Sequence, residues 1–115
     1  MLEVYQAMLE DVGVAAKVQI VEWTLASQGE YDLFGYSNGT TTTGDASWAL
    51  NRQFLTGGDE NRGNFSSAKV DELIRRLSKE SDATLRRELA CNALKAGNEE
   101  TALIPVMFPT RLYGI

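Results

Sequence analysis

The chain has 115 residues, enough for one domain, with a formal net charge of −5, 43% hydrophobic residues and 23% charged residues. These proportions are typical of a globular protein, and the scattering of its eleven basic residues argues against nucleic acid as a partner. The lack of histidine and the single Cys91 exclude a zinc site, a histidine-based triad and an internal disulfide within this sequence. We expect Cys91 to be a half-buried structural thiol.

A helix and two strands are predicted first. Apolar residues recur at three- and four-residue spacing over residues 1–12, and Gly13 follows as a stop. No capping residue precedes this helix, so we expect the chain to continue upstream. Residues 15–23, AAKVQIVEW, alternate polar and apolar side chains in the manner of a strand. Residues 31–37, YDLFGYS, form a short aromatic and apolar run, which predicts a second strand buried on both faces.

Three helices are expected next. The first is capped by Asp45 and stopped by Gly57, and the second is capped by Ser67. The third begins at Ser81 or Asp82, and the short break before it predicts an antiparallel or sharply angled helix pair. Its apolar stripe consists of Leu85, Leu89, Ala93 and Ala96.

Charges on these helices are assigned to the surface, and the end of the chain to an edge strand. No glycine-rich phosphate cradle lies near the two arginine pairs, so we expect helix-surface charges there. The pairs are Arg75 with Arg76 and Arg86 with Arg87. Residues 102–115 are apolar and β-prone, but two prolines cannot donate to a ladder, which confines this segment to an edge or an irregular extended path.

The order of these elements indicates an α/β fold in which helices cover a small mixed sheet. We predict a single domain over residues 1–115. A sheet of three strands is small, and a further strand from outside this sequence would make it more stable.

The candidate site is the stretch 35–50, GYSNGTTTTGDASWAL, which leaves the second predicted strand and enters a helix. Open α/β sheets bind ligands at such strand ends. Its hydroxyl and amide groups donate and accept hydrogen bonds without charge, which suits a neutral or zwitterionic solute. The alternative of a merely solvated loop stays open. The predicted ligand-binding residues are Tyr36, Ser37, Asn38, Thr40, Thr41, Thr42, Thr43 and Trp48.

No catalytic residue, cofactor or metal is predicted. Neighbouring carboxylates such as Asp71 and Glu72 point in different directions on a helix, so they make a poor catalytic pair. No histidine base is available to pair with a serine or with Cys91. We therefore expect a protein that is not an enzyme.

Four segments in order resemble the C-terminal part of family 5 extracellular solute-binding proteins, the dipeptide, oligopeptide and nickel-chelate binding components of ABC importers. In the first segment a helix ends at a glycine before a Val/Ile-rich strand, and in the second a Gly-aromatic pair precedes a polar loop and Gly-Asp. The third contains a capped helix with Val-Asp, and the fourth a strand with Ile-Pro-Val. The segments are residues 7–23, 29–54, 61–94 and 102–115.

This resemblance implies that residues 1–115 are part of the C-terminal lobe of a two-lobed periplasmic-binding-protein fold of type II. The polar loop would then face the cleft between the lobes. The implied partners are a peptide-like or other small solute, the missing N-terminal lobe and the permease subunits of an ABC transporter. The implied location is the periplasm, or the cell exterior as a membrane-anchored protein.

Three departures from the family pattern bear on the ligand. Tyr36 stands where many members have Trp, Ala46 replaces a frequent proline, and no acid lies between Asn38 and Thr43, where peptide-binding members hold an ammonium group. An ammonium group in a desolvated cleft needs an opposite charge. We therefore expect a modified peptide, a sugar-like or a chelate-type solute. The alternative function is a free-standing α/β protein-interaction module.

Overall fold

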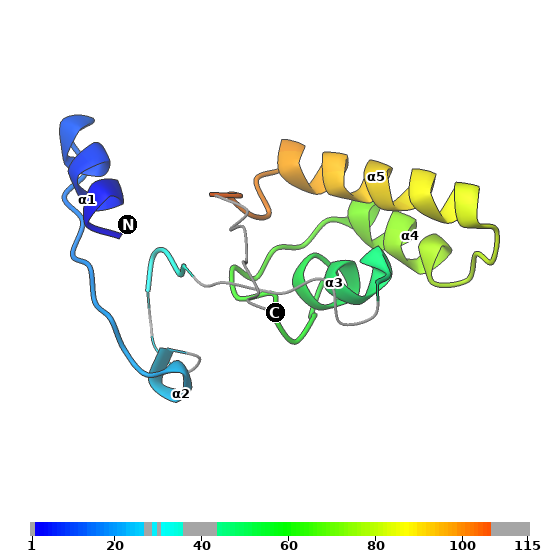
Figure 1. Ribbon diagram of the computed structural model, residues 1–115, viewed down its shortest axis with the longest axis horizontal. Coiled ribbons are helices and arrows are strands. Elements are labelled where there is room, and N and C mark those ends of the chain that lie inside the picture. The colour runs from blue at the N-terminus through cyan, green and yellow to red at the C-terminus, as the bar shows by residue number, and fades with distance from the viewer. Residues whose placement is uncertain (1, 27–28, 30, 36–43, 107–115) are drawn as a thin grey trace, which may run out of the picture. The chain divides into compact units, whose positions relative to one another are not determined.

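The computed structural model describes residues 2–26, 29, 31–35 and 44–106 of the chain (Figure 1). The chain divides into two compact units, Met1–Phe34 and Gly35–Ile115, and each is described on its own. The single domain predicted over residues 1–115 stays a prediction. The regular structure of the described residues is helical and consists of α1 (Leu2–Asp11), α2 (Trp23–Ala26), α3 (Ala46–Gln53), α4 (Ala68–Leu77) and α5 (Ala83–Glu99).

The predicted α/β fold with a small mixed sheet is wrong for the described part of the chain, which contains no strand. Residues 14–22 have no regular structure, and Ile20 among them is 88% exposed. Residues 31–35 form no strand either, and Leu33 is 69% exposed rather than buried. The third predicted strand is also absent from residues 102–106, and its remainder lies outside the described residues.

The physical reason for this difference is that strand-forming residues do not make a sheet by themselves. β-branched and aromatic residues favour a pleated, half-buried surface. The ladder of a sheet, however, requires a neighbouring strand that accepts and donates the backbone hydrogen bonds, and isolated strand pairs are marginal in water. In the described residues these segments have no such neighbour, so their local preference produces no strand.

In the unit Met1–Phe34, the predicted first helix is confirmed as α1. The chain turns at Gly13, whose φ of +83° is a conformation that glycine adopts without strain. The N–H of Val14 then donates to the carbonyl of Leu9, and the side-chain amide of Gln6 donates to the carbonyl of Ala16. These bonds fold the following segment back on α1. No residue of α1 is buried, so nothing in the described residues covers its predicted apolar face.

In the unit Gly35–Ile115, α3, α4 and α5 pack around one core (Figure 1). The hydroxyl of Ser67, before α4, donates to Glu100, after α5, at 3.1 Å. At the opposite end, Arg86 in α5 donates to the carbonyl of Leu77 in α4 at 2.9 Å. α4 and α5 are therefore antiparallel, one of the two predicted arrangements. The core consists of Leu50, Phe54, Val70, Ile74, Leu77, Leu89, Ala90, Ala93 and Ala96.

The predicted starts of these three helices are confirmed. Asp45 and Ser67 accept hydrogen bonds from backbone N–H groups two and three residues ahead, at 2.7 and 3.3 Å. At α5 the cap is Asp82 rather than Ser81, since one oxygen of the Asp82 carboxylate accepts the N–H groups of residues 84 and 85, both at 2.9 Å. The capped starts fix where each helix leaves its loop.

The buried stripe of α5 begins one turn later than predicted and also includes Ala90 and Gly97. Leu89, Ala93 and Ala96 are buried as expected, but Leu85 is 47% exposed and Cys91 is exposed rather than half-buried.

None of the helices in the described ranges is long and apolar enough to cross a membrane.

Candidate ligand-binding site

The structure describes one of the eight predicted ligand-binding residues. Trp48 lies in α3 and is half-buried. The described border of the predicted loop is therefore the start of α3, together with the side chains that hold it. We refer to Asp45, Trp48, Arg52 and Arg86 as the α3 cluster. The predicted residues that lie outside the described ranges are Tyr36, Ser37, Asn38, Thr40, Thr41, Thr42 and Thr43.

Trp48 is held under an arginine of its own helix. The guanidinium carbon of Arg52 lies 4.7 Å from the centre of the indole ring, within the range of a cation–π contact. Two carboxylates hold this guanidinium in turn, Asp59 at 2.9 Å and Glu60 at 2.9 Å. The hydrogen bond from Arg52 holds the pKa of Asp59 below its usual range. The Arg52 side chain is therefore fixed from two sides, and it covers one face of the indole.

The connector between α3 and α4, which supplies these two carboxylates, is held by a half-buried amide and a buried acid. The side-chain nitrogen of Asn61 donates to the carbonyls of Leu55 and Phe65, at 3.1 and 2.7 Å, and its oxygen accepts the N–H of Phe65 at 2.9 Å. Asp71 of α4 is buried and accepts the N–H of Thr56 at 2.9 Å. An irregular segment lacks the regular backbone hydrogen bonds of a helix or sheet, and these side-chain hydrogen bonds satisfy its backbone groups instead. The connector therefore has a defined path beside α3.

Asp45 ties the start of α3 to α5. One carboxylate oxygen accepts the N–H of Ser47 at 2.7 Å, and the other lies 2.6 Å from a guanidinium nitrogen of Arg86. Hydrogen bonds from the Ser47 hydroxyl, from the Ser47 backbone and from Arg86 lower the pKa of Asp45 to about 2, against a small opposing effect of burial. The carboxylate is therefore ionised at neutral pH, and its charge is balanced by Arg86.

Arg86 was expected to be a helix-surface charge, and this prediction is wrong. Its side chain is only 25% exposed, and besides Asp45 it donates to two carbonyls near the end of α4, Leu77 at 2.9 Å and Glu80 at 2.7 Å. A signal was present in the sequence. Arg86 precedes the buried Leu89 by three residues and the buried Ala90 by four, and residues at these spacings share one face of a helix.

Each charged side chain of the α3 cluster lies beside an opposite charge. Asp45 faces Arg86, and Arg52 faces Asp59 and Glu60. Within the described ranges, no group of three or more His, Cys, Asp or Glu side chains could hold a metal ion. The described border of the site thus offers a fixed aromatic ring and paired charges, which suit contact with a neutral ligand surface better than direct metal coordination.

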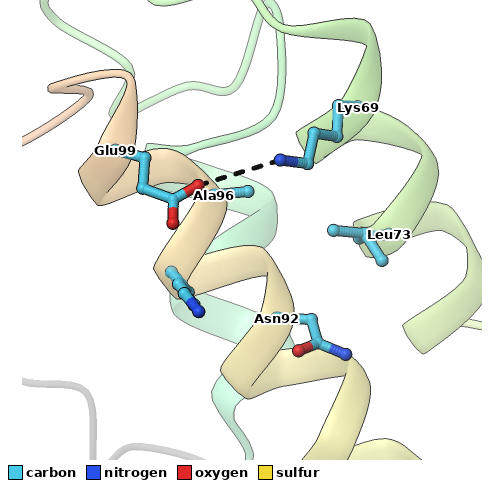
Figure 2. Close-up of a pocket in the computed structure, with 6 residues that line it drawn as sticks. Lys69, Leu73, Asn92, Ala96 and Glu99 are labelled. Carbon is cyan, nitrogen blue, oxygen red and sulfur yellow. Dashed lines mark ion pairs between the residues drawn. The ribbon is translucent and has the colours of Figure 1, made fainter.

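A hollow lies between α4 and α5, and Trp48 is not among the residues that line it. Figure 2 shows Lys69 and Leu73 of α4 facing Asn92, Ala96 and Glu99 of α5, with Lys95 completing a lining around about 340 Å³. Lys69 and Glu99 lie 3.8 Å apart, and both side chains are more than half exposed. Such solvated pairs contribute little, and the open hollow has none of the buried polar groups that orient a ligand.

Comparison with known proteins gives one similarity. No family model matches the chain, and no solved structure matches it significantly. The chain is 26% identical, over 83 residues, to the nickel-binding protein NikA of Staphylococcus aureus (strain NCTC 8325 / PS 47). The aligned stretch covers 72% of this chain and 17% of NikA, so the chain spans less than a fifth of the length of this relative. This similarity links the chain loosely to solute-binding proteins.

Proposed function

We propose that this chain is the solute-recognising part of the substrate-binding protein of an ABC importer and that it carries out no catalysis. The observation that carries the proposal is the similarity to a nickel-binding protein, which extends over 72% of the chain. The order of the sequence segments that resemble family 5 solute-binding proteins supports it independently. In this proposal the ligand contacts the polar segment 36–43 and Trp48.

The proposed ligand is an uncharged or internally compensated solute, such as a modified peptide, a sugar-like molecule or a metal chelate. The segment 36–43 carries hydroxyl and amide groups and no charged side chain. Asp45 of the α3 cluster and the neighbouring Asp59 and Glu60 are already paired with arginines. The sequence has no histidine, the commonest protein ligand of metals such as nickel. The residues of this chain would therefore contact a metal through its chelator, by hydrogen bonds rather than by direct coordination.

The proposal also includes a second lobe and a transporter. A ligand that contacts two lobes stabilises their closed arrangement, because only that arrangement makes both sets of contacts. The second lobe would be supplied by other parts of the same protein. The closed form would then deliver the solute to the permease subunits, from the periplasm or from the outer surface of the membrane.

Calorimetric titration of the intact native protein tests the ligand class. The probes are Ni²⁺ alone, a preformed nickel–citrate chelate, dialanine and N-acetylated dialanine. We expect the chelate or the blocked dipeptide to bind more tightly than bare Ni²⁺ or free dialanine, because the segment 36–43 offers no charge for an ammonium group or a cation. Tightest binding of free dialanine would contradict the ligand class, and failure of a wider solute panel to bind would contradict the function.

Substitution tests the site assignment. Replacing Asn38, Thr40 and Thr42 by alanine should weaken solute binding and leave folding intact, because surface substitutions cost at most about 0.5 kcal/mol each. The matched control replaces three exposed polar residues of α5 by alanine and should leave affinity unchanged. These control residues are Thr84, Asn92 and Asn98. Equal affinity in the two triple variants would show that the segment is not the site.

A second candidate function is that of a protein-interaction module, and the unit Met1–Phe34 favours it. Its described residues expose many large apolar side chains, and contiguous exposed apolar surface commonly marks an interface. They include Val4, Met8, Val12, Ile20, Trp23, Leu25 and Leu33, each more than half exposed. The mass of the native polypeptide separates the candidates. A mature chain of 12.7 kDa favours the module, and one several times larger favours the binding protein.

A further inference from the structure

We infer that Arg86 is a positioning residue for the candidate site: it fixes the first turn of α3, and with it Trp48, against the end of α4. The inference rests on the proposed function in one respect, namely that Trp48 contacts the solute. Arg86 itself lies in α5, 38 positions further along the chain than Trp48, so the sequence alone does not connect the two residues.

The guanidinium of Arg86 makes contacts to two different helices at once. Its Nη1 donates to the carbonyl oxygens of Leu77 and Glu80, at 2.9 and 2.7 Å. The last carbonyls of a helix lack partners within the helix, so these bonds satisfy the end of α4. Its Nη2 donates to the carboxylate of Asp45 at 2.6 Å, immediately before α3. One side chain of α5 therefore joins the end of α4 to the start of α3.

The connection continues from Asp45 to Trp48 within the first turn of α3. One carboxylate oxygen of Asp45 is held by Arg86 while the other accepts the N–H of Ser47 at 2.7 Å. The carbonyl of Asp45 accepts the N–H of Trp48 at 3.4 Å. Asp45 can cap α3 without Arg86, but the cap would then lack its charged link to α4 and α5. Arg86 thus determines where the capped turn lies, and the turn determines where the indole lies.

A role in general stability would give a different pattern of effects. Arg86 is not a member of the buried core, which is made by apolar side chains of α3, α4 and α5. Loss of the guanidinium should therefore leave the helices in place and alter chiefly the start of α3. Lysine should replace it only in part, because a single ammonium cannot reproduce the planar fork that reaches a carboxylate and two carbonyls together. Arg87 is exposed and adjacent, so it serves as the matched control.

Fluorescence of Trp48 tests the inference without any ligand. In a Trp23→Phe background of the full chain, Trp48 is the single tryptophan. Arg86→Gln should shift its emission to longer wavelength and increase its quenching by acrylamide, with far-UV circular dichroism unchanged. Arg86→Lys should give a smaller change, and Arg87→Gln none. Unchanged emission and quenching in Arg86→Gln, with the helices intact, would overturn the inference.

Titration of the same variants with nickel–citrate tests its consequence for binding. Arg86→Gln should weaken binding by about tenfold, or about 1.4 kcal/mol, because the first turn of α3 and the indole of Trp48 are no longer held in place, while Arg87→Gln binds normally. If the intact protein without substitutions binds none of the solutes, the proposed function fails. The fluorescence result then still decides whether Arg86 positions Trp48. If the unsubstituted chain binds and Arg86→Gln binds equally well, the inference fails and the function stands.

Discussion

Gly97 of α5 packs directly against the ring of Phe54, the residue that follows α3. A Cβ atom at this position would lie 2.6 and 2.7 Å from two carbons of the Phe54 ring. The ring is itself only 4% exposed, so it cannot swing into solvent. A glycine in the middle of a helix costs about 1 kcal/mol relative to alanine. Here the close approach of the phenyl ring explains why that cost is accepted.

Gly97→Ala should therefore destabilise the protein, although alanine is the better helix former. Overpacking costs about 1–3 kcal/mol, which exceeds the gain in helix propensity of about 1 kcal/mol or less. Urea denaturation followed by circular dichroism measures the change. Gly63→Ala, where an added Cβ meets nothing within 4 Å, is the control. Adding Phe54→Leu should recover part of the loss caused by Gly97→Ala, and a stabilised Gly97→Ala protein would contradict the packing described here.

Asp45 gives a prediction on pH. Its folded-state pKa is lowered from 3.8 to about 2, so its hydrogen bonds stabilise the fold fully above the unfolded pKa and are lost as the pH falls through about 2. Asp45→Asn should therefore be less stable than the unsubstituted chain at neutral pH, and this difference should shrink between pH about 4 and pH about 2. Urea midpoints measured across this range give the result. A difference of constant size down to pH 2 would contradict the assignment.

At the scale of the elements, the sequence left two neighbouring residues, Ser81 and Asp82, as possible N-caps of α5. Both Ser81 and Asp82 are good caps, and their side chains differ little in intrinsic preference. In the structure Asp82 takes the role because one of its oxygens accepts two backbone N–H groups, while the N–H groups of both Ser81 and Asp82 are bound by Glu80. The choice is thus made by the path of the loop after α4.

Replacing these two residues in turn tests the assignment. Asp82→Ala should lower the free energy of unfolding by about 0.5–2 kcal/mol, because two N–H groups at the start of α5 lose their acceptor. Ser81→Ala should change it by less than about 0.5 kcal/mol. Chemical denaturation of both variants under the same conditions measures the difference. Equal effects, or a larger effect at Ser81, would mean that α5 begins differently in solution.

At the scale of the whole molecule, the buried core belongs to one of the two units. Every member of the core cluster lies between Leu50 and Ala96, in the unit Gly35–Ile115. In the unit Met1–Phe34, Ala26 is the buried apolar residue among those described. Apolar burial is the main favourable contribution to folding, so the two units contribute to it unequally.

A chain of residues 35–115 should therefore fold without residues 1–34. We expect it to keep the helical circular dichroism of α3, α4 and α5 and to unfold in urea with a midpoint close to that of the full chain. A sharp fall in the midpoint, or loss of the helical signal, would show that the first unit stabilises the second. Residues 1–34 alone are the complementary control and should show little cooperative unfolding. A chain this short, with Ala26 as the one buried apolar side chain among its described residues, lacks a sufficient core.

Much of the second unit and part of the candidate site could be predicted from the sequence. The caps at Asp45 and Ser67 depend on local preferences, which a sequence displays directly. The antiparallel pairing of α4 with α5, one of the two predicted arrangements, depends on a short connection. Trp48 was correctly placed in a helix directly after the polar segment. Arg86 was misassigned because its partners are distant in the chain: its contact with Asp45 spans 41 positions, and no local rule reports such a contact.

The sequence by itself determined where α3 and α4 begin, because capping groups act within a few residues. It also determined that segment 36–43 is polar and uncharged, and that these 115 residues contribute no histidine to any site built from it. Only the tertiary structure decided that Arg86 joins three helices, that Gly97 must remain small beside Phe54, and that the β-prone segments described here form no sheet. The physical reason is common to all three: each depends on which groups from distant parts of the chain are within reach as partners.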